Sequence, residues 1–157
     1  MITKKLPKGL YVSRVVASAY QEGKVYASLN GYRNDNFLPY LYMSEDYGNT
    51  WKQIGKDLPN EPINVIKEDH LVDGILYVGT DGGLYVSINQ GADFMQWNKG
   101  LPNGVPIHDI VTQPRENEIV LGTHGRSLYI AKLEEVQKLV LDAKFKDKKL
   151  AEIIGNK

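Results

Sequence analysis

An internal repeat is the feature that most constrains the fold of this chain. Each repeat contains two short apolar runs, and the second run carries a Leu-Tyr dipeptide whose tyrosines are Tyr42, Tyr85 and Tyr129, 43 and 44 positions apart. A Leu-Pro pair also recurs, at Leu6-Pro7, Leu58-Pro59 and Leu101-Pro102. A period of about 40–50 residues with strand-like content is typical of a β-propeller blade. Because such repeats bury their apolar faces against one another, the sequence predicts an all-β array of blades.

Each repeat divides into strand-sized runs separated by turn residues. The second repeat has expected strands at residues 63–68, 75–80, 84–87 and 94–98. The first has them at 13–20, 24–29, 40–44 and 51–54, with a long loop at residues 30–39, and the third at 107–112, 118–123 and 127–131, without a fourth. We therefore expect about three four-stranded antiparallel blades, at about 8–59, 60–102 and 103–132. Residues 2–7 match the outer strand of a neighbouring blade, so residues 1–132 are expected to form a partial β-propeller.

The period changes after the third repeat. Leu133, Val136, Leu139, Val140 and Ala143 fall on one face of a helix, with charged residues elsewhere. Leu150, Ile153 and Ile154 continue the pattern after a break. The sequence therefore predicts a helical tail over residues 133–157 that begins with an amphipathic helix.

Composition narrows the function classes. Lys+Arg and Asp+Glu are 19 each in 157 residues, so the charge balance shows no preference for nucleic acid or an anionic membrane. Cysteine is absent, which excludes disulfides and thiolate metal sites. No apolar run approaches the roughly 18 residues of a membrane span, and no signal-peptide core follows Met1–Lys5. We expect no cofactor, no metal and no membrane insertion.

One segment between expected strands has the form of a structured hairpin. The residues Ser44, Asp46, Gly48, Thr50 and Trp51 read S-x-D-x-G-x-T-W. The aspartate can accept hydrogen bonds from turn N–H groups, and the glycine can take a positive φ. Trp51, together with Tyr42, is expected to lie in the core. A degenerate copy follows one period later, at Ser87, Asn89, Gly91 and Phe94.

This motif is similar to the Asp-box of bacterial neuraminidase repeats. With the lines GILYVGTDGGLYVS and ENEIVLGTHGRSLYIA, it makes the chain resemble the closing blades of Asp-box propellers, such as glycosyl hydrolase-like and sortilin-type proteins. The resemblance covers roughly residues 8–136 and implies a propeller of six to ten blades in a secreted or cell-surface protein. From the chain itself the compartment stays open.

A complete active site is not expected in this chain. A sialidase-type site would need three arginines on one carboxylate, whereas Arg14, Arg33, Arg115 and Arg126 occupy unlike repeat positions. Cleavage of a glycan between two propellers would need opposed carboxylates across a cleft that three blades cannot form. The three histidines are interpreted as surface residues. No catalytic residue is therefore assigned, and any parent enzyme would be a glycoside hydrolase.

The loops that join second to third strands share one face of a propeller, and the Asp-box turns lie on the other. Tyr32, Arg33, Asp81, His124 and Arg126 are on the first set of loops and are the candidate binding residues. Tyrosine beside Asn and Asp at a loop tip suits a glycan or a peptide. The alternative for Asp81 and His124 is that each only supports a turn before a glycine.

Two functions remain open at this stage. The leading interpretation is a non-catalytic propeller module for interaction or scaffolding, whose partners are further blades from a parent chain or a second copy. The alternative is a fragment of a glycoside hydrolase whose catalytic carboxylates lie outside this chain. The exposed flanks of three blades could be covered by a homo-oligomer that exchanges the 2–7 strand, or on one side by the C-terminal helix. We favour association, because the helix could cover only one of the two flanks.

Overall fold

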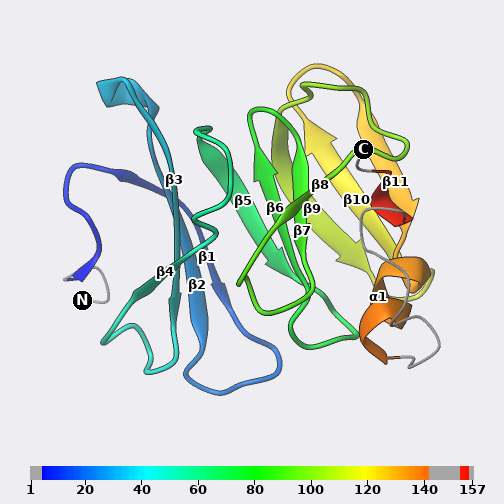
Figure 1. Cartoon of the computed structure of the whole chain (residues 1–157), viewed down its shortest axis with the longest axis horizontal. Coiled ribbons are helices and arrows are strands. Elements are labelled where there is room, and N and C mark those ends of the chain that lie inside the picture. Colours follow the sequence, from blue (N-terminus) through cyan, green and yellow to red (C-terminus); the bar gives the residue numbers. More distant parts are fainter. Residues whose placement is uncertain (1–4, 142–152, 156–157) are drawn as a thin grey trace.

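A computed structural model describes residues 5–141 and 153–155 as three antiparallel sheets arranged side by side (Figure 1). We call these sheets blades 1, 2 and 3 in chain order. Blade 1 contains β1 (Tyr11–Ala17), β2 (Val25–Gly31), β3 (Asn36–Ser44) and β4 (Lys52–Ile54), paired in that order. The chain therefore builds each sheet as a meander of neighbouring strands.

The prediction of a long loop at residues 30–39 of the first repeat is wrong. Strands β2 and β3 extend until Gly31 pairs with Asn36, and the short 3-10 helix η2 (Tyr32–Asn34) closes the hairpin. Asp35 follows with a φ of 53°, in the left-handed region that aspartate enters more readily than most residues. The insertion is thus an ordered hairpin tip.

Blade 2 contains β5 (Ile63–Glu68), β6 (Leu76–Thr80), β7 (Leu84–Ser87) and β8 (Met95–Trp97). It lies between the other two blades, and its first strand contacts the first strands of both. A Cβ added at Gly79 would lie 2.7 Å from Val65 Cγ1 and 2.8 Å from the carbonyl oxygen of Ile107. Glycine at this position therefore allows the first strand of blade 3 to approach the sheet closely.

Blade 3 contains β9 (Ile107–Gln113), β10 (Glu118–Thr123) and β11 (Leu128–Lys132), with β10 in the middle. Over residues 5–141 and 153–155 it has three strands, as the third repeat predicted. Two continuous apolar cores join the blades. The blade 1–2 core includes Tyr26, Ile66 and Phe94, and the blade 2–3 core includes Tyr77, Trp97 and Ile119.

The helix α1 (Glu134–Leu141) packs at the junction of blades 2 and 3. Leu133, Val136 and Leu139 enter the blade 2–3 core as predicted, but Val140 is exposed and Gln137 is buried in its place. The carbonyl oxygen of Ile154 accepts hydrogen bonds from the N–H groups of Asn98 and Lys99, at 2.9 and 2.8 Å. The helix and the residues around Ile154 therefore both pack on this junction, while Leu128 and Ile130 of blade 3 stay exposed.

Several predictions for the chain ends lie outside the described residues, including Ala143, Leu150 and most of the 2–7 segment. Leu6 is described and is buried against Ala27 and Leu29 of blade 1. Within the described parts, no helix is long and apolar enough to span a bilayer. The blade boundaries and the extent of the helical tail stay predictions.

The Asp-box segment forms a tight turn between β3 and β4. Asp46 Oδ1 accepts hydrogen bonds from Ser44 Oγ at 2.8 Å and from the N–H of Thr50 at 2.7 Å, and Asp46 Oδ2 accepts one from Thr50 Oγ1 at 2.6 Å. Tyr47 and Gly48 both have positive φ, at 58° and 82°. The degenerate copy between β7 and β8 repeats the geometry, with Asn89 Oδ1 accepting from Ser87 Oγ at 2.8 Å.

Trp51 and Tyr42 are half-buried, so the expectation that both are core residues is wrong in part. They pack with Leu6, Ala27 and Leu29 on the side of blade 1 that faces away from blade 2. Phe94, which occupies the position of Trp51 in the second Asp-box segment, is buried in the blade 1–2 core. The difference is that Phe94 lies in a core shared by two blades, whereas Trp51 packs against the smaller cluster formed by Leu6, Ala27 and Leu29.

The hydrogen bonds of the turn make one pH-dependent prediction. Hydrogen bonds from Thr50, first from its side chain and then from its backbone, lower the pKa of Asp46 to about 2. A lowered pKa contributes stability that is present above the unfolded-state value of about 3.9 and is lost as the pH falls through the folded value. We expect the stability difference between the wild type and Asp46→Asn to shrink over that window. Urea unfolding against pH measures it, and the exposed Asp35→Asn is the control. An unchanged difference down to the folded pKa would contradict the prediction.

Candidate functional site

The connections that follow β2, β6 and β10 lie at one end of the sheets, which we call the axis end, and the Asp-box turns lie at the other (Figure 1). The five candidate binding residues are therefore on one side of the molecule. Tyr32 and Arg33 are exposed on η2 and contact each other, with Arg33 Nε donating to Tyr32 Oη at 3.1 Å. His124 and Arg126 lie on the β10–β11 turn at the far end of the arc, with Asp81 between. The structure places the five residues on one side but does not bring them into a single cluster.

Each first strand carries a bulge near this end of its sheet. The register skips one residue in β1, β5 and β9, and the skipped residues are Ser13, Asn64 and His108. A bulge bends the strand and re-aims a side chain, and bulges are common beside functional sites. All three bulged residues are polar and capable of hydrogen bonding. Sequence analysis missed this set, although each follows a β-branched residue at the start of its repeat.

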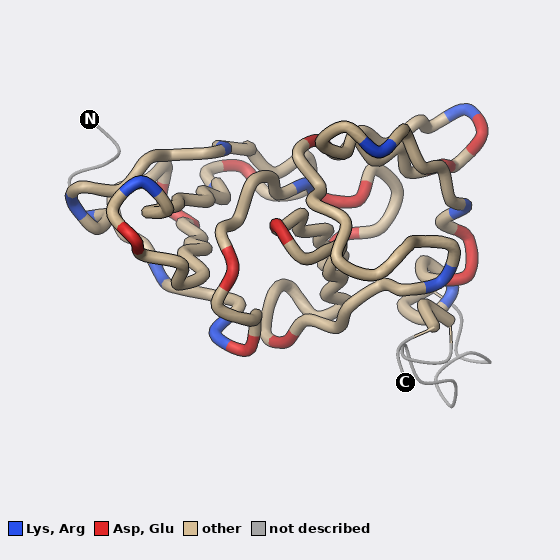
Figure 2. Tube along the Cα trace, turned by 90° about the horizontal axis from the view of Figure 1, so that it is seen from above, with Lys and Arg blue, Asp and Glu red and all other residues tan. Residues whose placement is uncertain are grey.

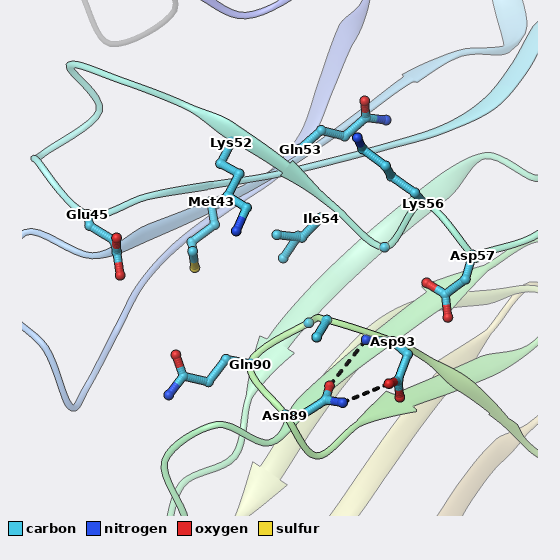
Figure 3. A pocket seen from close by; sticks show the side chains of 13 residues that line it. Met43, Glu45, Lys52, Gln53, Ile54, Lys56, Asp57, Asn89, Gln90 and Asp93 are labelled. Carbon is cyan, nitrogen blue, oxygen red and sulfur yellow. Dashed lines mark hydrogen bonds between the residues drawn. The ribbon is translucent and has the colours of Figure 1, made fainter.

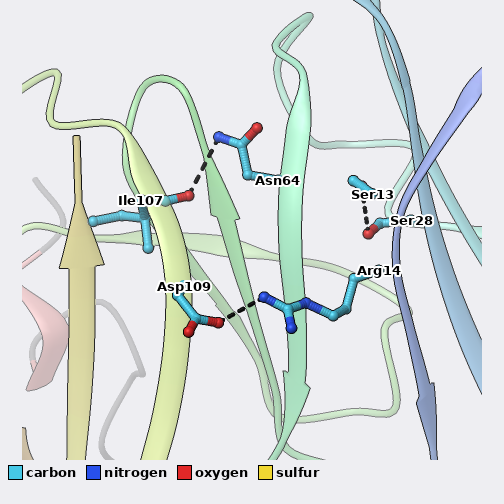
Figure 4. Close-up of polar contacts among 6 residues, drawn as sticks. All are labelled: Ser13, Arg14, Ser28, Asn64, Ile107 and Asp109. Carbon is cyan, nitrogen blue, oxygen red and sulfur yellow. Dashed lines mark hydrogen bonds and ion pairs between the residues drawn. The ribbon is translucent and has the colours of Figure 1, made fainter.

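The bulged side chains connect neighbouring blades. Ser13 Oγ donates to the carbonyl oxygen of Ile63 at 2.7 Å, and Asn64 Nδ2 lies 3.3 Å from the carbonyl oxygen of Ile107 (Figure 4). Ile63 and Ile107 are equivalent, because each is the last paired residue before the bulge. The bulged residue of one blade thus contacts the backbone of the following blade.

Asp81 and His124 also have partners that sequence analysis did not identify. Asp81 Oδ1 accepts a hydrogen bond from Asn64 Nδ2 at 2.9 Å. The rings of His124 and His108 lie with their centroids 5.3 Å apart, at an angle of 45°. The bulged residue and the residue after the second strand therefore form a pair in blade 2 and again in blade 3. Blade 2 offers a carboxylate and an amide there, and blade 3 offers two imidazoles.

An ion pair links the first strand of blade 1 to the first strand of blade 3. Arg14 Nη2 on β1 lies 2.6 Å from Asp109 Oδ1 on β9, so the pair spans β5 and links blade 1 to blade 3 (Figure 4). Both side chains are about half exposed, so the pair contributes at most about 1 kcal/mol to stability. Asn30, which corresponds to Asp81 and His124 in blade 1, is buried, and its Oδ1 has no protein partner among the described residues. The axis end thus combines hydrogen-bonding groups of several kinds.

An open groove of about 660 Å³ lies at the opposite end, between β4 and the second Asp-box turn (Figure 3). Two of its three carboxylates, those of Asp57 and Asp93, are engaged in the fold, and the third belongs to Glu45. Asp57 Oδ2 accepts the N–H of Phe94 at 2.6 Å, and Asp93 Oδ2 accepts from Asn89 Nδ2 at 2.8 Å. This arrangement holds the Asp-box turn of blade 2 on blade 1. It does not provide the pair of free opposed carboxylates that glycoside hydrolysis needs.

The distribution of charged residues does not indicate a particular class of ligand. Lys and Arg alternate with Asp and Glu around the outline of the molecule, without a region of one sign (Figure 2). Within residues 5–141 and 153–155, no group of three or more His, Asp or Glu side chains is placed to hold a metal ion. The chemistry available at the axis end is therefore hydrogen bonding to a polar ligand.

Comparison with known proteins decides the fold. An ancestral GH74 enzyme matches 77% of this chain with 22% identity and a TM-score of 0.61, and a GH74 enzyme from Niastella koreensis matches 77% with 19% identity and a TM-score of 0.61. YCF48 bound to a D1 peptide matches 80% with 17% identity and a TM-score of 0.53. The chain has the fold of a β-propeller segment. It spans only 15%, 21% and 37% of these three proteins.

The same comparisons leave the family open. No family model matches the sequence, and no curated protein matches it. At identities below 25%, the similar structures establish the fold alone. The Asp-box and sortilin-type resemblance therefore stays an interpretation of the sequence motifs.

Proposed function

We propose that this chain is a non-catalytic propeller segment that acts as an interaction module and binds a peptide or a glycan at the axis end of its blades. The observation that carries the proposal is the repeated pair of bulged and post-strand side chains, Asn64 with Asp81 and His108 with His124. Such pairs offer both donors and acceptors to a polar ligand. The likeness to a YCF48 structure with a bound peptide supports a peptide as one ligand class.

The proposed partners include further propeller blades. Three blades leave two sheet faces open, and these would be covered by blades from a parent chain or from a second copy. Secretion or a cell-surface location is proposed from the Asp-box resemblance alone.

A GH74 xyloglucanase from Xanthomonas campestris is a further similar structure, which makes xyloglucan a reasonable test glycan. Binding can be mapped by nuclear magnetic resonance with a panel of xyloglucan oligosaccharides and a panel of unstructured peptides. We expect amide shifts at the axis end, around Asp81 and His124. Asp81→Ala should weaken binding by roughly 10- to 150-fold, because a hydrogen bond to a charged group contributes about 1.5–3 kcal/mol. Asp93→Ala, at the opposite end, is the matched control and should leave the affinity unchanged. Shifts confined to the Asp-box turns would refute the proposal.

The likeness to two GH74 enzymes favours one alternative, in which the chain is a fragment of a glycoside hydrolase whose catalytic carboxylates lie outside it. In that case the axis end would contribute to substrate binding only. A longer natural chain that contains these blades would then hydrolyse xyloglucan, and this chain alone would bind its oligosaccharides without cleaving them. Absence of hydrolysis by the longer chain would remove the alternative.

A further inference from the structure

Residues at equivalent positions of the three blades can be identified from the strand register and their burial compared. Strand register makes Val15, Ile66 and Ile110 equivalent, since each pairs with the same position on the second strand of its blade. Ile66 and Ile110 lie in the cores shared with the preceding blade and are 1% and 4% exposed, whereas Val15 is 45% exposed. We call the side that packs on the preceding blade the leading face, and the side that packs on the following blade the trailing face. Within the described residues, the leading face of blade 1 is therefore covered only in part, by the segment around Leu6, whereas the equivalent faces of blades 2 and 3 are buried by the preceding blade.

Over the part of the chain that the structure describes, the trailing face of blade 3 is exposed at two equivalent positions. Leu41, Leu84 and Leu128 are equivalent by register and are 0%, 1% and 69% exposed in blades 1, 2 and 3. Met43, Val86 and Ile130 are equivalent as well, at 8%, 0% and 63%. The side chains are apolar at both positions in all three blades. Only the presence of a following blade separates the buried pairs from the exposed one.

The hydrogen bond from each bulged residue to the following blade is also incomplete at both ends of the arc. Ser13 of blade 1 and Asn64 of blade 2 each reach a backbone carbonyl of the following blade. Their equivalent in blade 3 is His108, which is exposed and can donate a hydrogen bond. The equivalent carbonyl on the leading side belongs to Val12 of blade 1. Each end of the arc therefore carries one half of the repeated contact.

We infer that a second copy of this chain covers both faces, with the trailing face of blade 3 in each copy packed on the leading face of blade 1 in the other. Two such contacts would close six blades into a ring, within the range of about 4–8 blades that propellers use. A single copy supplies both complementary surfaces, and its zero formal charge adds no net repulsion. The inference rests on the proposed function only in treating the chain as a segment completed by further blades.

The contact is face packing and does not need an exchanged strand. Residues 2–6 align with 54–58 and 97–101, and β4 and β8 end at Ile54 and Trp97. The equivalents of this segment therefore lie mostly in the links between blades. Leu6 is buried on the leading face of blade 1, as its equivalent Leu58 is buried against the leading face of blade 2. The described part of the segment thus packs on blade 1 of the same copy.

Mass measurement by light scattering, without any ligand, tests the inference. We expect a dimer of the full chain at micromolar concentration. Ile130→Glu on the trailing face and Val15→Lys on the leading face should each weaken association by roughly tenfold or more, because a charge is placed at the centre of an apolar contact. Leu71→Glu is the matched control, since Leu71 is also an exposed apolar residue but lies on neither face. Both sites are exposed in the single copy, so folding should be retained, which circular dichroism checks.

An equimolar mixture of Ile130→Glu and Val15→Lys distinguishes this arrangement from others. In a head-to-tail ring each variant alone loses both contacts, while a mixed dimer keeps one contact between two unaltered faces. Partial recovery of the dimer in the mixture supports the inference. A wild type that stays a well-folded monomer, a long polymer, or a mixture without recovery would overturn it. None of these outcomes bears on ligand binding at the axis end, so the two proposals can fail separately.

Discussion

Replacing Asp69 with alanine is expected to lower the free energy of unfolding by about 3–5 kcal/mol, the range for removing one partner from a buried charged network. Asp69 is 1% exposed, and its carboxylate accepts hydrogen bonds from the N–H groups of Leu71 and Val72, both at 2.8 Å, and from Tyr77 Oη at 2.7 Å. Gln137 Nε2 of α1 lies 3.2 and 3.1 Å from its two oxygens. The substitution would leave the two N–H groups and the Tyr77 hydroxyl without this acceptor, while Gln137 Nε2 would keep Asn117 Oδ1, at 3.0 Å.

The size of this effect follows from what Asp69 connects. It joins the end of β5 to β6 through Tyr77 and to the helix through Gln137, so one carboxylate holds elements that lie far apart in the sequence. Burial, followed by the charge of Asp69, raises the pKa of Tyr77 well above its usual range, so this phenol stays protonated and able to donate.

Urea unfolding of Asp69→Ala, Gln137→Leu and the exposed Asp73→Ala measures this prediction. Asp73 is in the same turn, so its variant is the control and should differ from the wild type by less than about 0.5 kcal/mol. Gln137→Leu should cost less than Asp69→Ala, because leucine removes one donor and the other three keep their acceptor. Equal stability of the Asp69 and Asp73 variants would contradict the role given to the buried carboxylate.

Phe94→Ala is expected to cost about 3–5 kcal/mol, as truncation of a large buried aromatic side chain does. Phe94 lies in the blade 1–2 core with Leu41 and Ile54, and both blades would lose contacts to the cavity. Trp51→Ala should cost less in the single copy, although tryptophan is larger, since Trp51 is half-buried on the leading face of blade 1.

Thermal and urea unfolding of both variants at low protein concentration compares the two positions directly. Phe37→Ala, which truncates an exposed aromatic residue of β3, is the control for loss of an aromatic ring outside a core. If Trp51→Ala proved more destabilising than Phe94→Ala under these conditions, the leading face of blade 1 would have to be covered within a single copy. At high concentration, a ring of two copies would bury Trp51 and bring its cost closer to that of Phe94.

The strands could be predicted from the sequence because their signals are local. Apolar alternation bounded by Asp-Gly and Leu-Pro placed most strands of the second and third repeats within a few residues of their observed bounds. The hairpin tip at residues 31–36 could not be predicted, since it depends on a pairing of Gly31 with Asn36 that composition does not reveal. In the tail, helical periodicity assigned Val140 to the buried face. Burial of Gln137 is instead favoured by its partners on two blades, Asp69 of blade 2 and Asn117 of blade 3.

The candidate site shows the same limit. Asp81 and His124 could be assigned to one end of the blades from repeat position alone. Their partners could not, because Asn64 and His108 are brought to them by bulges that displace the register of the first strands. A bulge is a tertiary adjustment to the neighbouring blade, and it has no sequence signature as plain as that of a turn.

The repeat period by itself determined that this chain forms blades, because a period of 43–44 residues with three or four short runs cannot bury its apolar residues except against further copies of the same unit. Only the tertiary structure decided which copies of each repeated residue are buried. Leu41, Leu84 and Leu128 occupy one position of the repeat, as do Trp51 and Phe94, yet their exposure differs with the presence of a neighbouring blade. Burial is a property of two surfaces in contact, and a sequence pattern describes only one of them.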